Sequence, residues 1–349
     1  MQRNTLRLGR VVELALVGTL LACGGGTAAP SAAPASQPAV SSASQSTSGS
    51  TAAAASASAA QPLPAAQQPT AAVAPVKPVE SGTKPAAPGE MPATLRVGLV
   101  PNQAPDRIRA QYKPFGDYLN QTLKIPVELF VATDYAGVVE AMANDKLDIA
   151  YFGGLTYLQA EKRAEVYPIV TEVDRETGTT KYYSAIITRP ESPVKTVADI
   201  RGKKFAFGDV NSTSGSLYPR ILLDRAGIGD FTNQQLFVYS GGHDATTLAV
   251  ANGTVDAGGV EKRIMQRLID GGQIKGDQIR IVEQTLVEGY PWVVRAKLDT
   301  GFVEKLTQAF LDINDQELLK LMRAEKYAKV TAKDYDEPRR QAARVGLLK

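Results

Sequence analysis

Short apolar runs alternate with longer amphipathic stretches from about residue 94 onward. The runs predict strands at 95–100, 127–131, 147–152, 204–207, 236–239 and 255–260. The stretches predict helices at 114–123, 134–144, 215–226, 244–252 and about 303–324, the first with Pro114 in its opening turn. Strands that alternate with helices in this way are typical of parallel sheets. The sequence therefore predicts an α/β fold.

A weak internal repeat divides this part of the chain into two halves. The segment DYAGVVEAMANDKLDIAYFG (134–153) resembles GHDATTLAVANGTVDAGGVE (242–261) at an offset of 108 residues. The matching pairs are Ala141 and Ala249, Ala143 and Ala251, Asn144 and Asn252, and Asp148 and Asp256. Each copy is predicted to form a helix, a turn and a strand. Two similar α/β lobes, each presenting helix N-termini, predict a clamshell with a ligand between the lobes.

The helices of the two copies begin at equivalent residues, Tyr135 and His243, and His243 is the only histidine in the chain. Residues that open helices are often packing or capping groups. Because these two occupy related positions that would face one cleft, we expect both to contact a ligand.

The pentapeptide STSGS occurs twice, at 46–50 and at 212–216. The second copy follows the predicted strand 204–207 and opens a helix, so its three hydroxyl residues lie at a helix N-terminus; these are Ser212, Thr213 and Ser214. Unpaired backbone N–H groups and the helix dipole favour an anion there, and Gly215 allows close approach. Simple N-capping needs one hydroxyl, so three hydroxyls and a glycine favour an anion site.

The first 93 residues lack this alternation. Residues 1–22 carry three arginines in their first ten positions and continue as an apolar stretch interrupted by Glu13, which indicates a secretory signal peptide. The stretch runs into LLAC, which resembles a bacterial lipobox and predicts that Cys23 is lipidated; a stray cysteine is the alternative. Residues 23–93, rich in alanine, serine and proline, cannot bury enough surface to offset their ordering entropy, so we expect a disordered linker.

Composition and net charge give no support for nucleic-acid, metal or nucleotide binding. The chain is 44% hydrophobic and 21% charged, and its formal net charge is +3. Three arginines and one glutamate in residues 1–22 account for +2 of that charge, which leaves +1 for the mature chain and no argument for nucleic acid. One histidine and one cysteine do not make a metal cluster, and the sequence has no P-loop. We expect neither a metal nor a cofactor.

Five stretches of this sequence together resemble the phosphate/phosphite/phosphonate ABC-transporter substrate-binding family. They are DYAGVVEAM, LDIAYFGGLT, FGDVNSTSGSLYP, GGHDATTLAVANGTVDAG and TAKDYDEPRR, and the likeness covers about residues 94–347. The resemblance implies a two-lobed periplasmic-binding-protein clamshell of type II with two hinge crossings. We expect lobe 1 over 94–183 plus 290–349, lobe 2 over 184–289, and crossing strands at 182–188 and 292–294.

The resemblance also implies a site for an oxyanion. The positions that match the family's binding residues are Tyr135, Ser212, Thr213, Ser214 and His243, with Tyr182 in KYYS as a further candidate. Family members that take aminoalkyl phosphonates carry a carboxylate for the ligand amine, and where one is expected this chain has Tyr290 in VEGYPWVV, which we also expect to bind the ligand. Glu261 and Glu288 are near but do not align with that position. Phosphite, a small alkyl phosphonate or phosphate is therefore expected rather than an aminoalkyl ligand.

The function implied is that of an extracytoplasmic, lipid-anchored, monomeric binding protein, not an enzyme, that serves an ABC permease and its ATPase. Two other classes of protein are compatible with these residues. A ligand-sensing domain for a signalling partner would use the same site. A Ser/His hydrolase could use His243 and Asp244 beside the serine-rich helix start, although the globular part has no G-x-S-x-G elbow.

Overall fold

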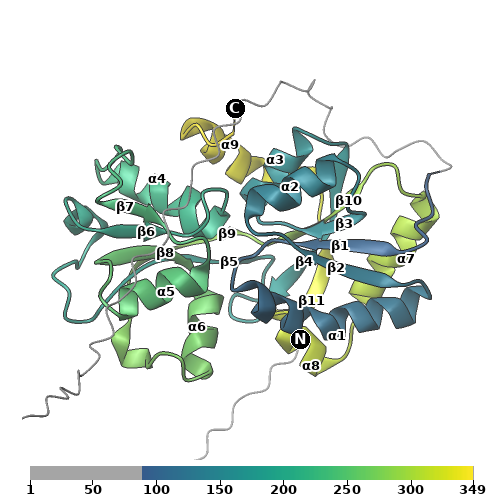
Figure 1. Cartoon of the computed structure of the whole chain (residues 1–349), viewed down its shortest axis with the longest axis horizontal. Coiled ribbons are helices and arrows are strands. Elements are labelled where there is room, and N and C mark those ends of the chain that lie inside the picture. The colour runs from purple at the N-terminus through teal and green to yellow at the C-terminus, as the bar shows by residue number, and fades with distance from the viewer. Residues whose placement is uncertain (1–88, 349) are drawn as a thin grey trace, which may run out of the picture. The chain divides into compact units, whose positions relative to one another are not determined.

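The computed structural model describes residues 89–348, which contain two sheets flanked by helices (Figure 1). The first sheet has the strand order β11-β4-β10-β3-β1-β2. Its strands are β1 (Leu95–Leu99), β2 (Val127–Val131), β3 (Ile149–Tyr151), β4 (Val166–Asp174), β10 (Pro291–Arg295) and β11 (Ala324–Lys329). The strand β1 is parallel to β2 and β3, whereas β10 and β11 run antiparallel to their neighbours.

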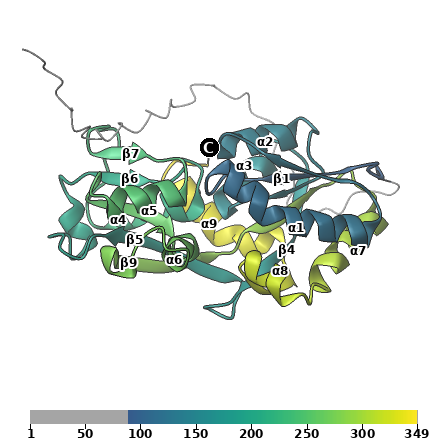
Figure 2. The same cartoon turned by 60° about the horizontal axis from the view of Figure 1, so that its bottom comes forward.

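The second sheet has the order β7-β6-β8-β5-β9. Its strands are β5 (Lys181–Thr188), β6 (Phe205–Phe207), β7 (Phe237–Tyr239), β8 (Ala257–Glu261) and β9 (Arg280–Glu288). Strand β6 is parallel to β7 and β8, and β5 is antiparallel to β8 and β9, which lies beside it in Figure 2. The predicted α/β class is confirmed, and the two sheets form the two lobes of a type II binding-protein fold.

Lobe 1, built on the first sheet, contains α1 (Pro105–Leu123), α2 (Tyr135–Ala143), α3 (Gly154–Glu161), α7 (Thr300–Leu311), α8 (Gln316–Leu321) and α9 (Asp336–Arg344). Lobe 2, built on the second sheet, contains α4 (Tyr218–Arg225), α5 (His243–Ala251) and α6 (Lys262–Asp270). The C-terminal helix α9, yellow in Figure 1, contacts α3 of lobe 1 and residues 213–217 of lobe 2. Within residues 89–348 no helix is both long and apolar enough to cross a bilayer.

The chain passes between the lobes twice. It leaves β4 at Asp174 and enters β5 at Lys181, and it returns from Glu288 at the end of β9 to Pro291 at the start of β10. The strands expected to form the crossings, 182–188 and 292–294, lie inside β5 and β10, so the links themselves are residues 175–180 and 289–290. The expected lobe boundary after residue 183 falls within β5.

Two helix predictions were wrong. Helix α1 begins at Pro105, so Pro114 lies inside it rather than in its first turn. The earlier start is favoured because Tyr112 is buried with Phe115 in an aromatic core, where Trp292 lies 5.0 Å from the Phe115 ring and 6.3 Å from the Tyr112 ring.

The long helix predicted over 303–324 is two helices, α7 and α8, followed by β11. The break lies at 312–315, where Asp315 caps α8 by accepting hydrogen bonds from the backbone N–H groups of Glu317 and Leu318, at 2.9 and 3.1 Å. Apolar spacing continues across this break, which is why periodicity by itself predicted one helix.

The internal repeat is a structural repeat. Helices α2 and α5 both span 9 residues and begin 108 residues apart, and β3 and β8 begin at the same offset. The carboxylate of Asp148 accepts a hydrogen bond from the Arg96 backbone N–H at 2.8 Å, and Asp256 accepts one from the Lys204 backbone N–H at 2.9 Å. Asp148 thus ties the start of β3 to β1, and Asp256 ties the start of β8 to the residue before β6. Each lobe therefore contains the same local unit.

Candidate functional site

The second STSGS segment forms a turn of π-helix at the carboxyl end of β6. Ser212 caps this turn, with its Oγ accepting a hydrogen bond from the Gly215 N–H at 3.0 Å, and residues Thr213–Leu217 lead into α4. Pro219 has no N–H to donate to the Gly215 carbonyl, which instead accepts from the Gly208 N–H at 2.9 Å. π-helical turns are frequent at functional sites, and this one lies in the connection between β6 and α4.

Gly215 is required by close packing. A Cβ atom at this position would lie 2.9 Å from Cε1 of His243 and 3.0 Å from Oγ of Ser212. The sequence predicted that this glycine admits a ligand; the structure shows that it admits the imidazole of His243. The π-helical turn and the start of α5 are therefore in direct contact.

The three hydroxyl oxygens of the turn all accept hydrogen bonds. Besides Ser212, Thr213 Oγ1 accepts from the Leu155 N–H of lobe 1 at 2.9 Å, and Ser214 Oγ accepts from the Tyr182 hydroxyl at 3.1 Å. All three side chains are buried. Each oxygen accepts one of these bonds and keeps its own hydrogen to donate, and the Ser212 hydroxyl lies next to the Tyr135 hydroxyl.

Tyr135 and His243 each present an unpaired polar atom. Both side chains are 1% exposed, and within the described part of the chain neither the Tyr135 hydroxyl nor Nε2 of His243 has a hydrogen-bond partner. Burial raises the pKa of Tyr135 well above its ordinary value, so its hydroxyl stays protonated. An unpaired buried donor costs about 1–3 kcal/mol, so each of these atoms calls for an acceptor.

The protonation state of His243 follows from its other nitrogen. Its Nδ1 accepts a hydrogen bond from the Glu261 backbone N–H at 3.1 Å, which assigns the proton of the neutral ring to Nε2. Burial lowers the pKa of His243 to about 4, more than the neighbouring carboxylates raise it, so the ring is neutral at pH 7. His243 is therefore a neutral Nε2–H donor.

Both helix starts also reach the opposite lobe through their backbones. The Tyr135 N–H donates to Oδ2 of Asp209 in lobe 2 at 3.3 Å, and the His243 N–H donates to the Asn102 carbonyl in lobe 1 at 3.0 Å. The two contacts come from equivalent positions of the repeat. They bring the N-termini of α2 and α5 to a shared place at the carboxyl ends of the strands, where open α/β sheets bind ligands.

Tyr182 and Tyr290 complete the set of predicted residues. Their rings lie 5.3 Å apart, and both side chains are 1% exposed. Tyr182 donates to Ser214, and the Tyr290 hydroxyl donates to Oε2 of Glu261 at 2.8 Å. The structure thus joins the seven predicted residues into one buried group, whereas Cys23 lies outside the described residues.

Glu261 lies next to Tyr290 although the two positions are not aligned in the sequence. A carboxylate does lie beside Tyr290, because Glu261 ends β8 and is fully buried there. Glu288 instead accepts from the Lys181 ammonium at 2.9 Å and the Tyr218 hydroxyl at 3.2 Å.

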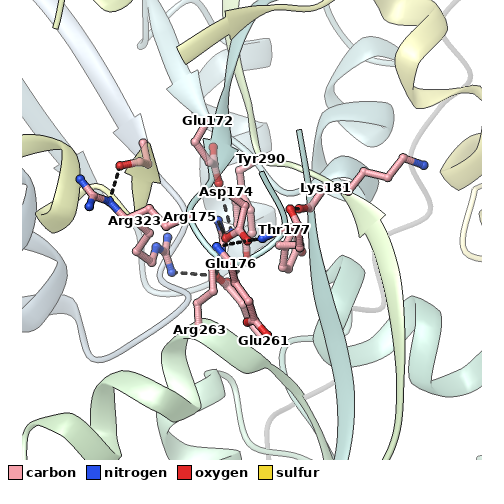
Figure 3. A network of polar contacts seen from close by, with 12 residues as sticks. Glu172, Asp174, Arg175, Glu176, Thr177, Lys181, Glu261, Arg263, Tyr290 and Arg323 are labelled. Carbon is pink, nitrogen blue, oxygen red and sulfur yellow. Dashed lines mark hydrogen bonds and ion pairs between the residues drawn. The ribbon is translucent and has the colours of Figure 1, made fainter. Parts of the chain in front are cut away.

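Two arginines next to Glu261 were missed by the sequence analysis. Oε1 of Glu261 accepts from Nε of Arg263 at 2.8 Å and from Nη1 of Arg323 at 2.9 Å, and this ionic network is drawn in Figure 3. Arg263 could have been suspected from the sequence EKR at the carboxyl end of a predicted strand. Arg323 is 62 residues from Glu261 in the chain and had no local signal.

The two sheets with two crossings, and a buried donor-rich group between them, define a two-lobed binding protein. The sequence model of the family described as "ABC transporter, phosphonate, periplasmic substrate-binding protein" matches residues 97–335. The chain belongs to this family, which confirms the resemblance seen in the sequence.

Named relatives agree with this assignment. The chain is 31% identical over 229 residues to the "Phosphate-import protein PhnD" of Mycolicibacterium smegmatis, covering 63% of this chain and 71% of that protein. It is 26% identical over 265 residues to the "Probable ABC transporter phosphite binding protein PhnD1" of Prochlorococcus marinus, covering 70% and 87%. The crystal structure of a binding protein component of an ABC phosphonate transporter from Pseudomonas aeruginosa superposes with a TM-score of 0.68 at 25% identity, covering 72% of this chain and 86% of that one.

Proposed function

We propose that this protein binds phosphite, a small alkyl phosphonate or phosphate between its lobes and delivers it to an ABC permease driven by an ATPase. The observation that carries the proposal is the pair of unpaired buried donors, the Tyr135 hydroxyl and Nε2–H of His243, one from each lobe. The hydroxyl hydrogens of residues 212–214 add three more donors. Hydrogen bonds to a charged oxygen are about twice as strong as neutral ones, so an oxyanion suits this group.

Closure of the lobes supports the same proposal. In addition to the bond between Thr213 and Leu155, the Thr156 hydroxyl of lobe 1 donates to the Asn211 carbonyl of lobe 2 at 3.0 Å. An oxyanion that accepts from Tyr135 and His243 together would add to these interlobe contacts and favour the closed form. The permease would then recognise the closed form.

The geometry around His243 favours binding over hydrolysis. In a Ser–His–Asp arrangement the carboxylate accepts a hydrogen bond from Nδ1–H of the histidine. Here Nδ1 accepts from the Glu261 N–H, and the Asp244 carboxylate accepts from the backbone N–H groups of Ala104 and Ala245, both at 2.9 Å. A ligand-sensing domain would use the same site. We place transport first because the named relatives are transport proteins.

The proposed ligand class is tested with a calorimetric panel of phosphate, phosphite, methylphosphonate and 2-aminoethylphosphonate, with sulfate as a control oxyanion. We expect at least one of the first three to bind with a Kd of about 1 μM or lower, and 2-aminoethylphosphonate to bind much more weakly. Tight binding of sulfate with no binding of any phosphorus oxyanion would contradict the proposal.

The proposed membrane anchor rests on residues outside the described part of the chain. We expect Cys23 to be lipidated on the outer side of the cytoplasmic membrane or in the periplasm, so that Cys23→Ala releases the protein from membranes or leaves it unprocessed. Cell fractionation and intact mass measure both outcomes. A Cys23→Ala protein that stays membrane-bound with the wild-type mass shift would show that the anchor lies elsewhere.

A further inference from the structure

Glu261 is a buried carboxylate that adjoins the proposed oxyanion site. Its backbone N–H holds Nδ1 of His243, and its Oε2 accepts from the hydroxyl of Tyr290, whose ring packs against Tyr182. A ligand substituent that extended from the hydroxyls toward Tyr182 would therefore meet Tyr290 and Glu261. An unmasked carboxylate at this place would attract a cationic substituent and repel the oxyanion.

The carboxylate is masked by two guanidinium groups, one from each lobe. Arg263 belongs to α6 in lobe 2, whereas Arg323 follows α8 in lobe 1, and both donate to Oε1 (Figure 3). Burial by itself would raise the pKa of Glu261, but the two guanidiniums outweigh burial and lower it to about 2. Glu261 is thus ionised, with both oxygens engaged by protein donors.

Arg323 is the more dedicated partner of the two. Arg263 also pairs with Glu172 at 3.1 Å and Asp174 at 3.2 Å, so its charge is shared among three carboxylates. Among the described residues, Glu261 is the carboxylate with which Arg323 forms an ion pair, and Arg323 also donates a hydrogen bond to the Tyr151 hydroxyl at 3.3 Å. Arg323 also has a φ of 65°, a left-handed conformation that is uncommon for a residue other than glycine.

The guanidiniums also occupy the aromatic faces that could hold a cation. The guanidinium carbon of Arg263 lies 4.4 Å from the ring centroid of Tyr182, and that of Arg323 lies 5.8 Å from the ring centroid of Tyr290. A ligand ammonium could take neither the carboxylate nor these ring faces without displacing an arginine, and it would be repelled by both.

We infer that Glu261, masked by Arg323 and Arg263, determines specificity by making the site reject a cationic ligand substituent while it accepts an uncharged one. This inference rests on the proposed function, because it concerns the substituent of the same phosphorus oxyanion. In this arrangement Arg323 is a positioning and charge-masking residue that does not itself contact the oxyanion.

The test compares 2-aminoethylphosphonate with propylphosphonate, which has the same length and no charge on its tail, for the wild type, Arg323→Gln and Arg323→Lys. The wild type should bind the amine at least 100-fold more weakly than propylphosphonate. Arg323→Gln should reduce this ratio at least tenfold, since one masking charge is gone, whereas Arg323→Lys should keep the ratio high. The double variant Glu261→Gln with Arg323→Gln should lose the gain in amine binding.

The contrary results are distinct. Equally weak binding of both ligands by the wild type would mean that the site selects ligands by size. An unchanged ratio in folded Arg323→Gln would mean that masking is irrelevant. Either result overturns the inference, whereas binding of methylphosphonate would still support the proposed function. Failure of methylphosphonate, phosphite and phosphate to bind the wild type would overturn both.

A second variant covers the case in which Arg323→Gln does not fold. Glu261→Gln keeps the shape of the side chain and removes its charge, so it should tighten methylphosphonate binding about threefold or more and leave 2-aminoethylphosphonate rejected. Weaker methylphosphonate binding by folded Glu261→Gln would overturn the inference, because the carboxylate would then assist the anion.

Discussion

Tyr135→Phe and His243→Asn should each weaken oxyanion binding roughly thirtyfold, about 2 kcal/mol, the loss expected for a hydrogen bond to a charged group. Tyr135→Phe removes only the unpaired hydroxyl. His243→Asn removes the Nε2–H donor, while its Oδ1 can still accept from the Glu261 N–H that Nδ1 accepts from now. Calorimetry with methylphosphonate measures each loss, and Tyr157→Phe is the matched control because that buried hydroxyl donates to Glu161 instead.

The double variant should lose less than the sum of the two single losses. In the proposed site each residue would bridge the lobes through the ligand, so after the first substitution the closed form would already be less favoured and the second would remove less. Strictly additive losses, with full ligand-induced compaction of both single variants in small-angle scattering, would show that the two residues do not act across one site.

The protonation state of His243 leads to a prediction about proton uptake on ligand binding. Because the pKa of His243 is about 4 and the neutral ring already carries a proton on Nε2, the histidine should contribute no proton uptake when the ligand binds at pH 7. Calorimetry in two buffers of different ionisation enthalpy, for the wild type and His243→Asn, measures this contribution. A histidine-dependent uptake near one proton would mean that the anion binds an imidazolium.

Asp148→Asn should lower the free energy of unfolding by about 3–5 kcal/mol, the usual cost of breaking a buried ion pair. The Asp148 side chain is fully buried and accepts from Nε of Arg96 at 2.9 Å and from Nη2 of Arg295 at 2.5 Å. The repeat supplies the control: Asp256 accepts the same backbone hydrogen bond but is only partly buried, so Asp256→Asn should cost about 1 kcal/mol. Urea unfolding followed by circular dichroism measures both, and equal losses would contradict the ion-pair argument.

Acid should weaken this part of the fold in a defined window. Burial would raise the pKa of Asp148, but hydrogen bonds and charge from Arg96 and Arg295 outweigh it and lower the pKa below the ordinary value of 3.8. The native state therefore binds fewer protons than the unfolded state below about pH 4, so this stabilisation is present above that pH and is lost as the pH falls through the lowered pKa. Asp148→Asn should remove this acid-sensitive contribution.

The repeat explains why so much of the site could be predicted from the sequence. An offset of 108 residues places Tyr135 and His243 at equivalent helix starts because each lobe repeats the same short unit, held by Asp148 or Asp256. The hydrophobic period, the helix caps and the helix termini depend on residues close together in the chain, so they can be recognised in the sequence. The helix start at residues 212–214 was predicted for the same reason. Its π-helical form, which depends on Pro219, was not predicted.

The masking arginines could not be predicted because their pairing is not local. Glu261 and Arg323 come from different lobes and meet only once both sheets are assembled and the chain turns at the left-handed residue Arg323, two residues after α8. The same holds for the bond between Thr213 and the Leu155 N–H, which requires α3 to face the π-helical turn. The carboxylate next to Tyr290 could not be predicted by aligning that position either, because it belongs to Glu261 at the end of β8.

A crystal structure of the protein with methylphosphonate tests the central claim most directly. We predict that one ligand lies between the lobes, with phosphonate oxygens within hydrogen-bond distance of both the Tyr135 hydroxyl and Nε2 of His243, and with the hydroxyls of residues 212–214 around it. A ligand that contacts just one of these two donors, or that binds away from the π-helical turn, would contradict the account.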